Sequence, residues 1–421
     1  MAKFLVQKSG PLHGEVSISG SKNAVLPILA AALLSEEDCT LDGVPGLKDV
    51  DIICDLIGEL GAAVCKDISN HRVTINAKNI TSCETPEELV KKMRASILVM
   101  GPLLARKGKA VIQLPGGCAI GDRPVELHFK GLSALGADIE VSADGIVTAH
   151  SNGLKGTNIY LDFPSVGATE NIVMAAGLAE GTTVLENAAQ EPEIVDLCNF
   201  LNKMGAKIKG AGTDCIKIEG VKSFHGANHV VIPDRIETGT FMIAAAITRG
   251  VVLVKNMIQD HVKPIIAKLR ECGVEIYDTD EGVLVKADEV ELISTDIKTL
   301  PYPGFPTDMQ SPFMALLTTV SGKSAVIETV FENRYMHVKE LTKMGAKITV
   351  KDRCAIIHGY NNLKSAKVVA TDLRAGAAVV LAGLVAEGVT EVSDIYHIER
   401  GYEHFAEKLT SLGAIIKRVE D

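Results

Sequence analysis

One pattern of apolar and polar positions repeats six times along the chain. Its form is Leu/Ile-x-x-(Leu/Met/Cys)-Gly-(Ala/Val), and successive copies are 68 to 75 residues apart. The six glycines are Gly61, Gly136, Gly205, Gly273, Gly345 and Gly413. Each follows an amphipathic stretch at the position of a helix C-terminal cap, and an alternating, strand-like run comes next. The clearest of these runs are residues 138–150, 207–220, 274–287 and 347–359.

A second element recurs in register with the first. It is an alanine-rich apolar helix, followed by a short turn and another strand. The six copies cover residues 24–43, 95–113, 170–187, 239–256, 311–329 and 376–394. Each unit therefore holds two helices and about four short strands. A nearly all-apolar helix beside a half-exposed one predicts an α/β unit with its sheet outside and one helix inside.

Six such repeats divide naturally into two domains of three. The joint falls near Val230 to Arg235, so we predict one domain over 21–232 and another over 1–20 plus 233–421. The strands KFLVQ and GEVSISG precede the first helix, and we expect them to pair with the C-terminal half. The chain would then cross twice between domains. Two crossings favour a hinged pair that closes over a cleft holding the active site.

The starts of the six apolar helices are polar. They read GSKN, KKMRA, FPSVGATE, PDRIETG, FPTDMQSP and TDLRAG. A helix N-terminus carries roughly half a positive charge and binds anions. Added to the cations Lys22, Arg94, Arg123, Arg374 and Arg400, these termini predict a local anion trap and a negatively charged substrate.

Composition removes several classes of function. With 53 Asp+Glu against 43 Lys+Arg the chain is acidic, which argues against a nucleic-acid binder. Nine cysteines without a CxxC pair, and histidines without HExxH spacing, predict neither a disulfide framework nor a metal site. The longest apolar runs, such as 24–34, are about half of the ~20 residues that span a bilayer. We expect a soluble, cytoplasmic protein without membrane contact.

The segment 115–124, PGGCAIGDRP, is the strongest candidate for chemistry. Its glycines and prolines predict a shaped, hinge-capable loop that holds a thiol, Cys118, near a guanidinium, Arg123. A surface loop with an incidental cysteine explains the same ten residues equally well. His128, just beyond the loop, either lines a site or lies on a helix surface.

The motifs together resemble one family. GSKNAVLP, PGGCAIGDRPVELH, PTDMQ, ENRYMHV, TDLRAG and IERGY occur in the order found in UDP-N-acetylglucosamine 1-carboxyvinyltransferases. The resemblance covers the whole chain. It implies two inside-out α/β domains, each built of three two-helix, four-strand units, as in 5-enolpyruvylshikimate-3-phosphate synthase. It also implies transfer of enolpyruvyl from phosphoenolpyruvate to the 3-hydroxyl of UDP-N-acetylglucosamine, the first committed step of bacterial peptidoglycan synthesis, without cofactor or metal.

The resemblance assigns roles to particular residues. Lys22, Asn23, Arg123 and Arg400 would bind phosphoenolpyruvate, a role that suits fixed cations. Cys118 would give a proton to the methylene carbon and would be the residue that fosfomycin alkylates. Lys22 could instead be a solvated charge, and Arg123 and Arg400 could form interdomain salt bridges.

Asp308 would be the base or proton relay at the sugar hydroxyl. The residues implied for UDP-N-acetylglucosamine are Asn23, Arg94, Arg123, Pro124, Val125, Glu126, Leu127, Ser165, Val166, Gly167, Asp308 and Val330. Those implied as support are Lys48, Glu332, Asp372 and Arg374. Asp308 and Asp372 stand at helix starts, so each could be an N-cap instead. Some family members have a lysine where this chain has Phe163-Pro164, so the chain departs from the family pattern beside the expected nucleotide.

Two other functions fit parts of the pattern. An enzyme of the same fold acting on shikimate 3-phosphate is one, although Cys118 within its loop speaks against it. A ligand-binding paralogue that regulates without catalysis is the other. An assay with each acceptor separates the three.

Overall fold

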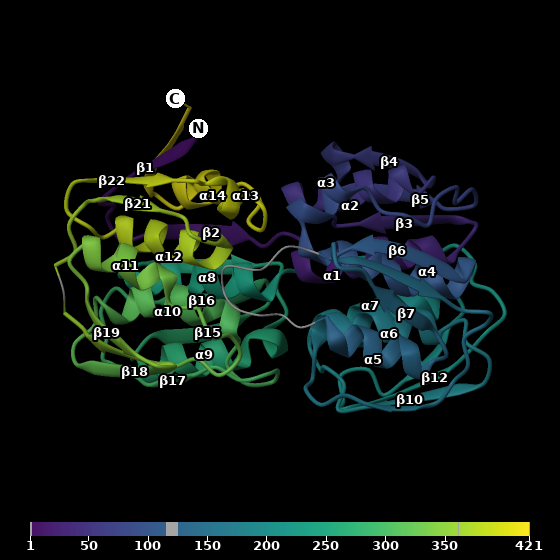
Figure 1. Ribbon diagram of the computed structural model, residues 1–421. Coiled ribbons are helices and arrows are strands. Elements are labelled where there is room, and N and C mark those ends of the chain that lie inside the picture. Colours follow the sequence, from purple (N-terminus) through teal and green to yellow (C-terminus); the bar gives the residue numbers. More distant parts are fainter. Residues whose placement is uncertain (1, 115–124, 361, 421) are drawn as a thin grey trace. The chain divides into compact units, whose positions relative to one another are not determined.

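The computed structural model describes residues 2–114, 125–360 and 362–420 as a mixed α/β structure. This part of the chain divides into two compact units (Figure 1). Unit 1 lies within Met1–Ser19 and Pro233–Asp421, and unit 2 lies within Gly20–Gly117 and Arg123–Ile232.

Each unit contains three small sheets. In five of the six sheets one edge strand is parallel to its neighbour and the other pairings are antiparallel. The sheets of unit 2 are β13(Asn228–Val230)-β3(Asp38–Asp42)-β5(Arg72–Asn76)-β4(Ala63–Asp67), β6(Lys109–Gln113)-β8(Ile146–His150)-β7(Asp138–Val141) and β11(Lys207–Lys209)-β12(Cys215–Glu219)-β10(Thr182–Glu186)-β9(Asn158–Tyr160). Those of unit 1 are β21(Lys367–Val369)-β22(Val389–Ser393)-β1(Lys3–Gln7)-β23(Ile415–Val419), β15(Glu275–Thr279)-β16(Gly282–Lys286)-β14(Val251–Lys255)-β2(His13–Ser17) and β17(Ile297–Lys298)-β18(Lys323–Ile327)-β20(Cys354–His358)-β19(Lys347–Lys351).

The three-stranded sheet in unit 2 is a shortened version of the others. Where its parallel edge strand would stand, the described residues show only an isolated bridge between Glu84 and Val111. The unit of two helices and about four strands is therefore confirmed, with one strand reduced to a single pairing.

Two kinds of helix accompany the sheets. The nearly all-buried helices are α1(Lys22–Ala31), α4(Met100–Lys107), α6(Val166–Ala176), α8(Arg235–Ile247), α10(Gln310–Leu317) and α12(Leu373–Gly383). The amphipathic helices are α2(Lys48–Glu59), α5(Glu126–Ala134), α7(Pro192–Lys203), α9(Lys263–Glu271), α11(Met336–Lys343) and α14(Phe405–Ser411), and two short helices are α3(Glu87–Lys92) and α13(Tyr396–Glu399). Each unit has its own apolar core, formed mainly by the first kind of helix and the inner faces of the strands. The predicted arrangement, with sheets outside and an apolar helix of each repeat inside, is confirmed.

The six repeat glycines all have left-handed backbone conformations. Their φ angles run from +92° at Gly273 to +104° at Gly61. A Cβ at Gly61 would also stand 2.5 Å from the carbonyl oxygen of Asn79. These glycines follow the amphipathic helices α2, α5, α7, α9, α11 and α14, so the predicted C-terminal caps are confirmed.

The first two strands belong to sheets formed by the C-terminal half of the chain. Strand β1 lies between β22 and β23 and is antiparallel to both, and β2 is parallel to β14 (Figure 1). The expected pairing of these strands with the C-terminal half is confirmed. Unit 2 closes in the same manner, because its last strand, β13, pairs with its first, β3.

A cluster of largely buried polar residues surrounds the two segments that connect unit 1 with unit 2. The amide of Asp234 donates to the carbonyl oxygen of Ser19 (2.9 Å), so the outgoing and returning segments are bonded to each other. The amide of Ser19 donates to Glu237 (3.1 Å), and its hydroxyl donates to Glu403 (2.6 Å). Lys408 donates to the Ser19 hydroxyl (2.6 Å) and to Glu237 (2.5 Å).

Glu237 makes the stability of this cluster dependent on pH. Burial raises the pKa of its carboxyl from 4.5 to about 7, although Lys408 opposes the shift. Between these two values the folded protein holds a proton that the unfolded chain releases, so the free energy of unfolding falls as pH rises through this window. We expect urea denaturation between pH 4.5 and 7 to show a shallower fall in the Glu237→Gln variant, which cannot titrate. Equal slopes in the two proteins would contradict the assignment.

Candidate functional site

Helices begin at the polar segments predicted from the sequence, and side chains cap several of these helix N-termini. Ser21 caps α1, Ser165 caps α6 and Asp234 caps α8. Asp372 caps α12, because its carboxylate accepts from the amides of Arg374 (2.9 Å) and Ala375 (3.0 Å). For Asp372 the N-cap alternative is therefore correct.

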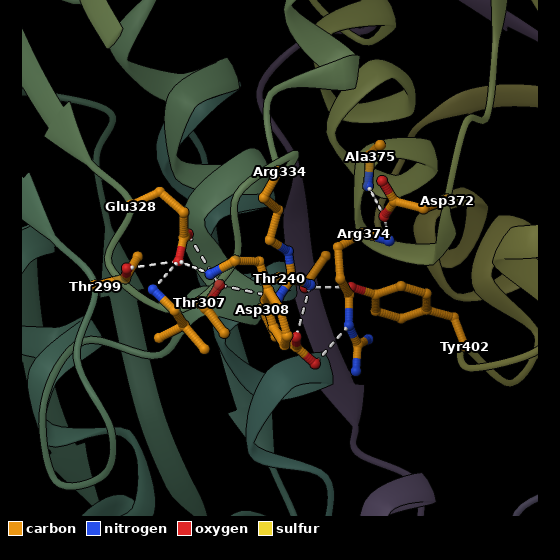
Figure 2. Close-up of polar contacts among 12 residues, drawn as sticks. Thr240, Thr299, Thr307, Asp308, Glu328, Arg334, Asp372, Arg374, Ala375 and Tyr402 are labelled. Atoms are coloured by element: carbon orange, nitrogen blue, oxygen red, sulfur yellow. Dashed lines mark hydrogen bonds and ion pairs between the residues drawn. The ribbon is translucent and has the colours of Figure 1, made fainter. Parts of the chain in front are cut away.

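For Asp308 the N-cap alternative is wrong. Asp308 lies inside the 3-10 helix Thr307–Met309 that leads into α10, and neither helix has a side-chain cap. Its two carboxylate oxygens instead pair with two arginines (Figure 2). Arg334 Nη2 lies 2.7 Å from Oδ1, and Arg374 Nε lies 3.2 Å from Oδ2. Both arginines are buried, whereas the Asp308 side chain is 25% exposed and can meet a ligand.

Arg374 brings further polar groups to the same place. Its guanidinium carbon lies 5.0 Å from the ring centroid of Tyr402, and the Tyr402 hydroxyl is 2.9 Å from the Thr240 hydroxyl (Figure 2). The terminal nitrogens of Arg374 are buried, and the guanidinium interacts with the Tyr402 hydroxyl, whose pKa is raised by burial and lowered in part by Arg374. Arg374 thus links Asp308 to the buried pair of Tyr402 and Thr240.

Lys22 is held by an ion pair at the first turn of α1 in unit 2. Its Nζ lies 2.8 Å from Oδ2 of Asp49, and the two side chains are only 13% and 2% exposed. The alternative of a solvated charge is therefore wrong. Asp49 follows Lys48, the exposed first residue of α2, so the starts of α1 and α2 meet at this pair. Asn23, next to Lys22, is half-buried.

The segments expected near the nucleotide also meet within unit 2. Val125 is the residue before α5, Glu126 and Leu127 are its first two residues, and Ser165 to Gly167 start α6. The ring of His128 connects them: a Cβ at Gly167 would lie 3.1 Å from its Cε1. Arg94 begins the 3-10 helix Arg94–Val99 and acts electrostatically on the same ring.

His128 is buried and neutral. Its Nδ1 lies 2.9 Å from the side-chain nitrogen of Asn171, which also donates to the carbonyl oxygen of Ile97 (3.0 Å). Burial, helped by the charge of Arg94, lowers the pKa of His128 to about 4. An imidazole that accepts at Nδ1 carries its proton on Nε2. The surface alternative for His128 is therefore wrong, and Asn171, which joins three segments by its bonds to His128, Ile97 and the amide of Gly101, was not predicted.

The remaining predicted residues have varied surroundings. Glu332 forms an exposed ion pair with Arg353 (2.7 Å). Val330 donates its amide to Glu328 (2.8 Å), and Arg400 is the half-buried C-cap of α13. Cys118, Arg123 and Pro124 lie outside the described residues.

Two absences hold for the part of the chain that the structure describes. No group of three or more His, Cys, Asp or Glu side chains is arranged to hold a metal ion. None of the helices has the length and apolar composition needed to cross a membrane.

Comparisons with known proteins agree over the whole length. The family model for EPSP synthase (3-phosphoshikimate 1-carboxyvinyltransferase) matches residues 6–409. UDP-N-acetylglucosamine 1-carboxyvinyltransferase 2 of Carboxydothermus hydrogenoformans is 60% identical and covers 100% of both chains. The corresponding enzyme 1 of Caldanaerobacter subterraneus is 59% identical over 99% of both, and that of Staphylococcus aureus is 54% identical over 100% of both.

Solved structures support the fold. The enolpyruvyl transferase NikO from Streptomyces tendae has a TM-score of 0.90 at 24% identity, covering 99% of both chains. EPSP synthase from Acinetobacter baumannii has a TM-score of 0.78 at 18% identity, covering 100% of both. The predicted inside-out, six-repeat fold is thus the fold of enolpyruvyl transferases.

Proposed function

The chain belongs to the UDP-N-acetylglucosamine 1-carboxyvinyltransferase family, and on that premise we propose the reaction it catalyses. It transfers the enolpyruvyl group of phosphoenolpyruvate to the 3-hydroxyl of UDP-N-acetylglucosamine and releases phosphate, the first committed step of peptidoglycan synthesis. The observation that carries this proposal is 54–60% identity to enzymes of that name over essentially the full length of both chains.

Asp308 is the base or proton relay at the sugar hydroxyl. A new C–O bond at the 3-hydroxyl requires that this hydroxyl lose its proton, and a partly exposed carboxylate can accept it. Arg334 pairs with one carboxylate oxygen of Asp308 and Arg374 pairs with the other, which supports a fixed orientation of this carboxylate.

Lys22, Asn23, Arg123 and Arg400 bind phosphoenolpyruvate. Support for Lys22 comes from its place in the first turn of α1, where the helix dipole and the ammonium group attract the same anion. Asp49 keeps this ammonium oriented at 2.8 Å until an anionic ligand shares it. The meeting of these groups with Asp308 in a cleft between domains 21–232 and 1–20 plus 233–421 stays a prediction.

UDP-N-acetylglucosamine binds along the starts of α5 and α6. The contacts proposed for it are Asn23, Arg94, Arg123 to Leu127, Ser165 to Gly167, Asp308 and Val330. The meeting of the α5 and α6 starts at the buried His128 ring supports a common binding surface for the contacts at these two helix starts. Lys48, Glu332, Asp372 and Arg374 support the site, Asp372 by capping the helix that carries Arg374.

Cys118 supplies the proton for the methylene carbon of phosphoenolpyruvate and is the target of fosfomycin. A thiol has the acidity for this task when cations surround it, as Arg123 five residues away would. No metal or organic cofactor takes part in the proposed reaction.

The test is a phosphate-release assay with two acceptors. Phosphate should appear only when phosphoenolpyruvate and UDP-N-acetylglucosamine are both present, and the rate should survive a metal chelator. Phosphate release with shikimate 3-phosphate in place of the sugar nucleotide would instead identify the protein as the enzyme of this fold that acts on shikimate 3-phosphate. Tight binding of UDP-N-acetylglucosamine without any release would show a ligand-binding paralogue.

A further inference from the structure

A fully buried carboxylate lies behind Asp308. Glu328 follows directly after strand β18, and its side chain is inaccessible to solvent. An ionised group in such a place is costly unless hydrogen bonds compensate for the lost water. The contacts of Glu328 therefore indicate what the residue is for.

The carboxylate of Glu328 accepts four hydrogen bonds. Its Oε1 accepts from the hydroxyl of Thr299 (2.9 Å) and from the amides of Val330 (2.8 Å) and Phe331 (3.2 Å). Its Oε2 accepts from the hydroxyl of Thr307 (2.9 Å). One side chain thus connects the loop that carries Val330 to the 3-10 helix that carries Asp308, as Figure 2 shows for its threonine contacts.

The hydroxyl of Thr307 passes this connection on to Asp308. A hydroxyl can donate only one hydrogen bond, and that of Thr307 is donated to Glu328. The Thr307 oxygen therefore acts as the acceptor toward Arg334 Nη1, which lies 2.9 Å away. The other terminal nitrogen of Arg334 donates to Asp308 Oδ1 at 2.7 Å (Figure 2). The order of donors and acceptors is fixed at every step: Thr307 to Glu328, then Arg334 to Thr307 and to Asp308.

A second contact joins the same groups. The guanidinium of Arg334 lies over the ring of Phe331, with 5.2 Å between its carbon and the ring centroid. The amide of Phe331 is one of the donors to Glu328. Glu328 therefore holds Arg334 both through the Thr307 hydroxyl and through the segment on which the guanidinium stacks.

We propose that Glu328 is a positioning residue, which acts through Thr307 and Arg334 to fix the carboxylate of Asp308 toward the acceptor hydroxyl. The inference rests on the proposed function and adds to it a chain of residues that do not touch the substrate. Productive geometry at a reacting group depends on such support, because a displacement of about 1 Å costs on the order of a hundredfold in rate.

Thr307 offers the most direct test. Loss of its hydroxyl interrupts the series of hydrogen bonds between Glu328 and Arg334 but leaves the bonds of Glu328 to the Val330 loop intact. In Thr307→Val the shape of the side chain remains but the hydroxyl is lost, and we expect kcat to fall about ten- to a hundredfold. The KM for phosphoenolpyruvate should stay unchanged, because the proposed anchors of that substrate lie elsewhere. Thr307→Ser, which restores the hydroxyl, should recover most of the rate.

Thr319→Val is the matched control. Thr319 is also half-buried in unit 1, but its hydroxyl donates only to the carbonyl oxygen of Leu316 in its own helix turn. Its removal should leave kcat unchanged. Circular dichroism at the assay temperature gives the folded fraction of each variant, and kcat is expressed per folded molecule, which removes a purely structural loss.

Glu328→Gln tests the buried end of the chain. The amide nitrogen of glutamine is a donor, so it cannot accept the Thr307 proton, and we expect a loss similar to that of Thr307→Val. The double variant with Thr307→Val and Glu328→Gln should lose little more of kcat than either single variant, because both changes interrupt the same series of hydrogen bonds. If Glu328→Gln does not fold, the three threonine variants still decide.

Three outcomes would overturn the inference. They are a Thr307→Val enzyme as fast as the wild type, failure of Thr307→Ser to recover the rate, or fully additive losses in the double variant. Absence of turnover by the wild type with UDP-N-acetylglucosamine would instead refute the proposed function, and the positioning role with it. The wild-type assay therefore distinguishes the two failures.

Discussion

Replacement of Asp308 by asparagine is expected to lower kcat about 10²- to 10⁴-fold, the usual contribution of a positioned proton acceptor. Asparagine has nearly the same shape and can still accept from Arg334, but it cannot take the proton of the sugar hydroxyl. It also removes the negative charge that Arg334 and Arg374 share, so a loss of stability should accompany the loss of turnover. The measurement is phosphate release under saturating substrates, with the unfolding midpoint recorded for the same preparation.

Alanine at this position should behave differently. The side chains of Arg334 and Arg374 are 4% and 2% exposed, and both pair with the single carboxylate of Asp308. Its loss leaves two buried guanidinium groups short of a counter-charge, which destabilises a protein by about 3–5 kcal/mol. Alanine also leaves both guanidinium groups without an acceptor, whereas asparagine keeps one acceptor oxygen, so Asp308→Ala should lower the unfolding midpoint further than Asp308→Asn.

Glu340→Gln provides the control for Asp308. Glu340 is another buried carboxylate of unit 1, paired with Lys343 at 2.7 Å and bonded to the amide of Val369 at 2.9 Å. Its neutralisation should affect stability and leave kcat near the wild-type value. A kcat of Asp308→Asn within tenfold of the wild type would contradict the role proposed for Asp308.

Removal of the thiol of Cys118 should lower kcat about 10²- to 10⁴-fold. Alanine offers no proton for the methylene carbon of phosphoenolpyruvate. Aspartate offers one, so Cys118→Asp should keep part of the activity. Because a carboxyl group lacks the nucleophilic sulfur, the aspartate variant should also resist fosfomycin, measured as residual activity and as protein mass after incubation.

The other cysteines serve as internal controls for this experiment. Burial raises the pKa of Cys54, Cys198 and Cys272 to about 12, so these thiols stay protonated and unreactive near neutral pH. Cys65 and Cys215 are exposed, and serine at either position should leave inactivation unchanged. Equal fosfomycin sensitivity of Cys118→Asp and the wild type would refute the assignment.

The fold could be predicted from the sequence because its signals are local. A glycine that must adopt a positive φ, an apolar helix beside an amphipathic one, and a polar helix start each lie within a few residues of the feature they predict. Such signals recur six times here, so each copy supports the others. The repeat that contains Gly136 also has its sheet, with one strand reduced to a bridge.

The candidate site was less predictable because its contacts are distant in sequence. Asp308 and Asp372 both follow a threonine at a helix start, yet only Asp372 is a cap. The difference depends on the 3-10 helix before α10 and on Arg334 and Arg374, which are 26 and 66 residues from Asp308. No local pattern contains those pairings. Arg334 and Tyr402 stand in motifs that carried the family resemblance, but nothing in the motifs reveals what they contact.

Buried polar residues inside apolar segments were missed for the same reason. Glu328 directly follows a strand and Asn171 lies within an apolar helix, and each is a buried polar residue beside mostly apolar neighbours. That departure is a usable signal. It predicts that a partner exists, and only the tertiary structure identifies the partner.

The central position of β1 between β22 and β23 imposes an order on biosynthesis. The described strands of unit 2, from β3 to β13, pair with one another, whereas β1 emerges first and must wait for β23 at Ile415–Val419. At about 5–20 residues per second, roughly 10–40 s separate completion of unit 2 from arrival of that last strand. Until then β1 lacks its pairing with β23, so the unit whose synthesis begins first is the one whose sheets are completed last.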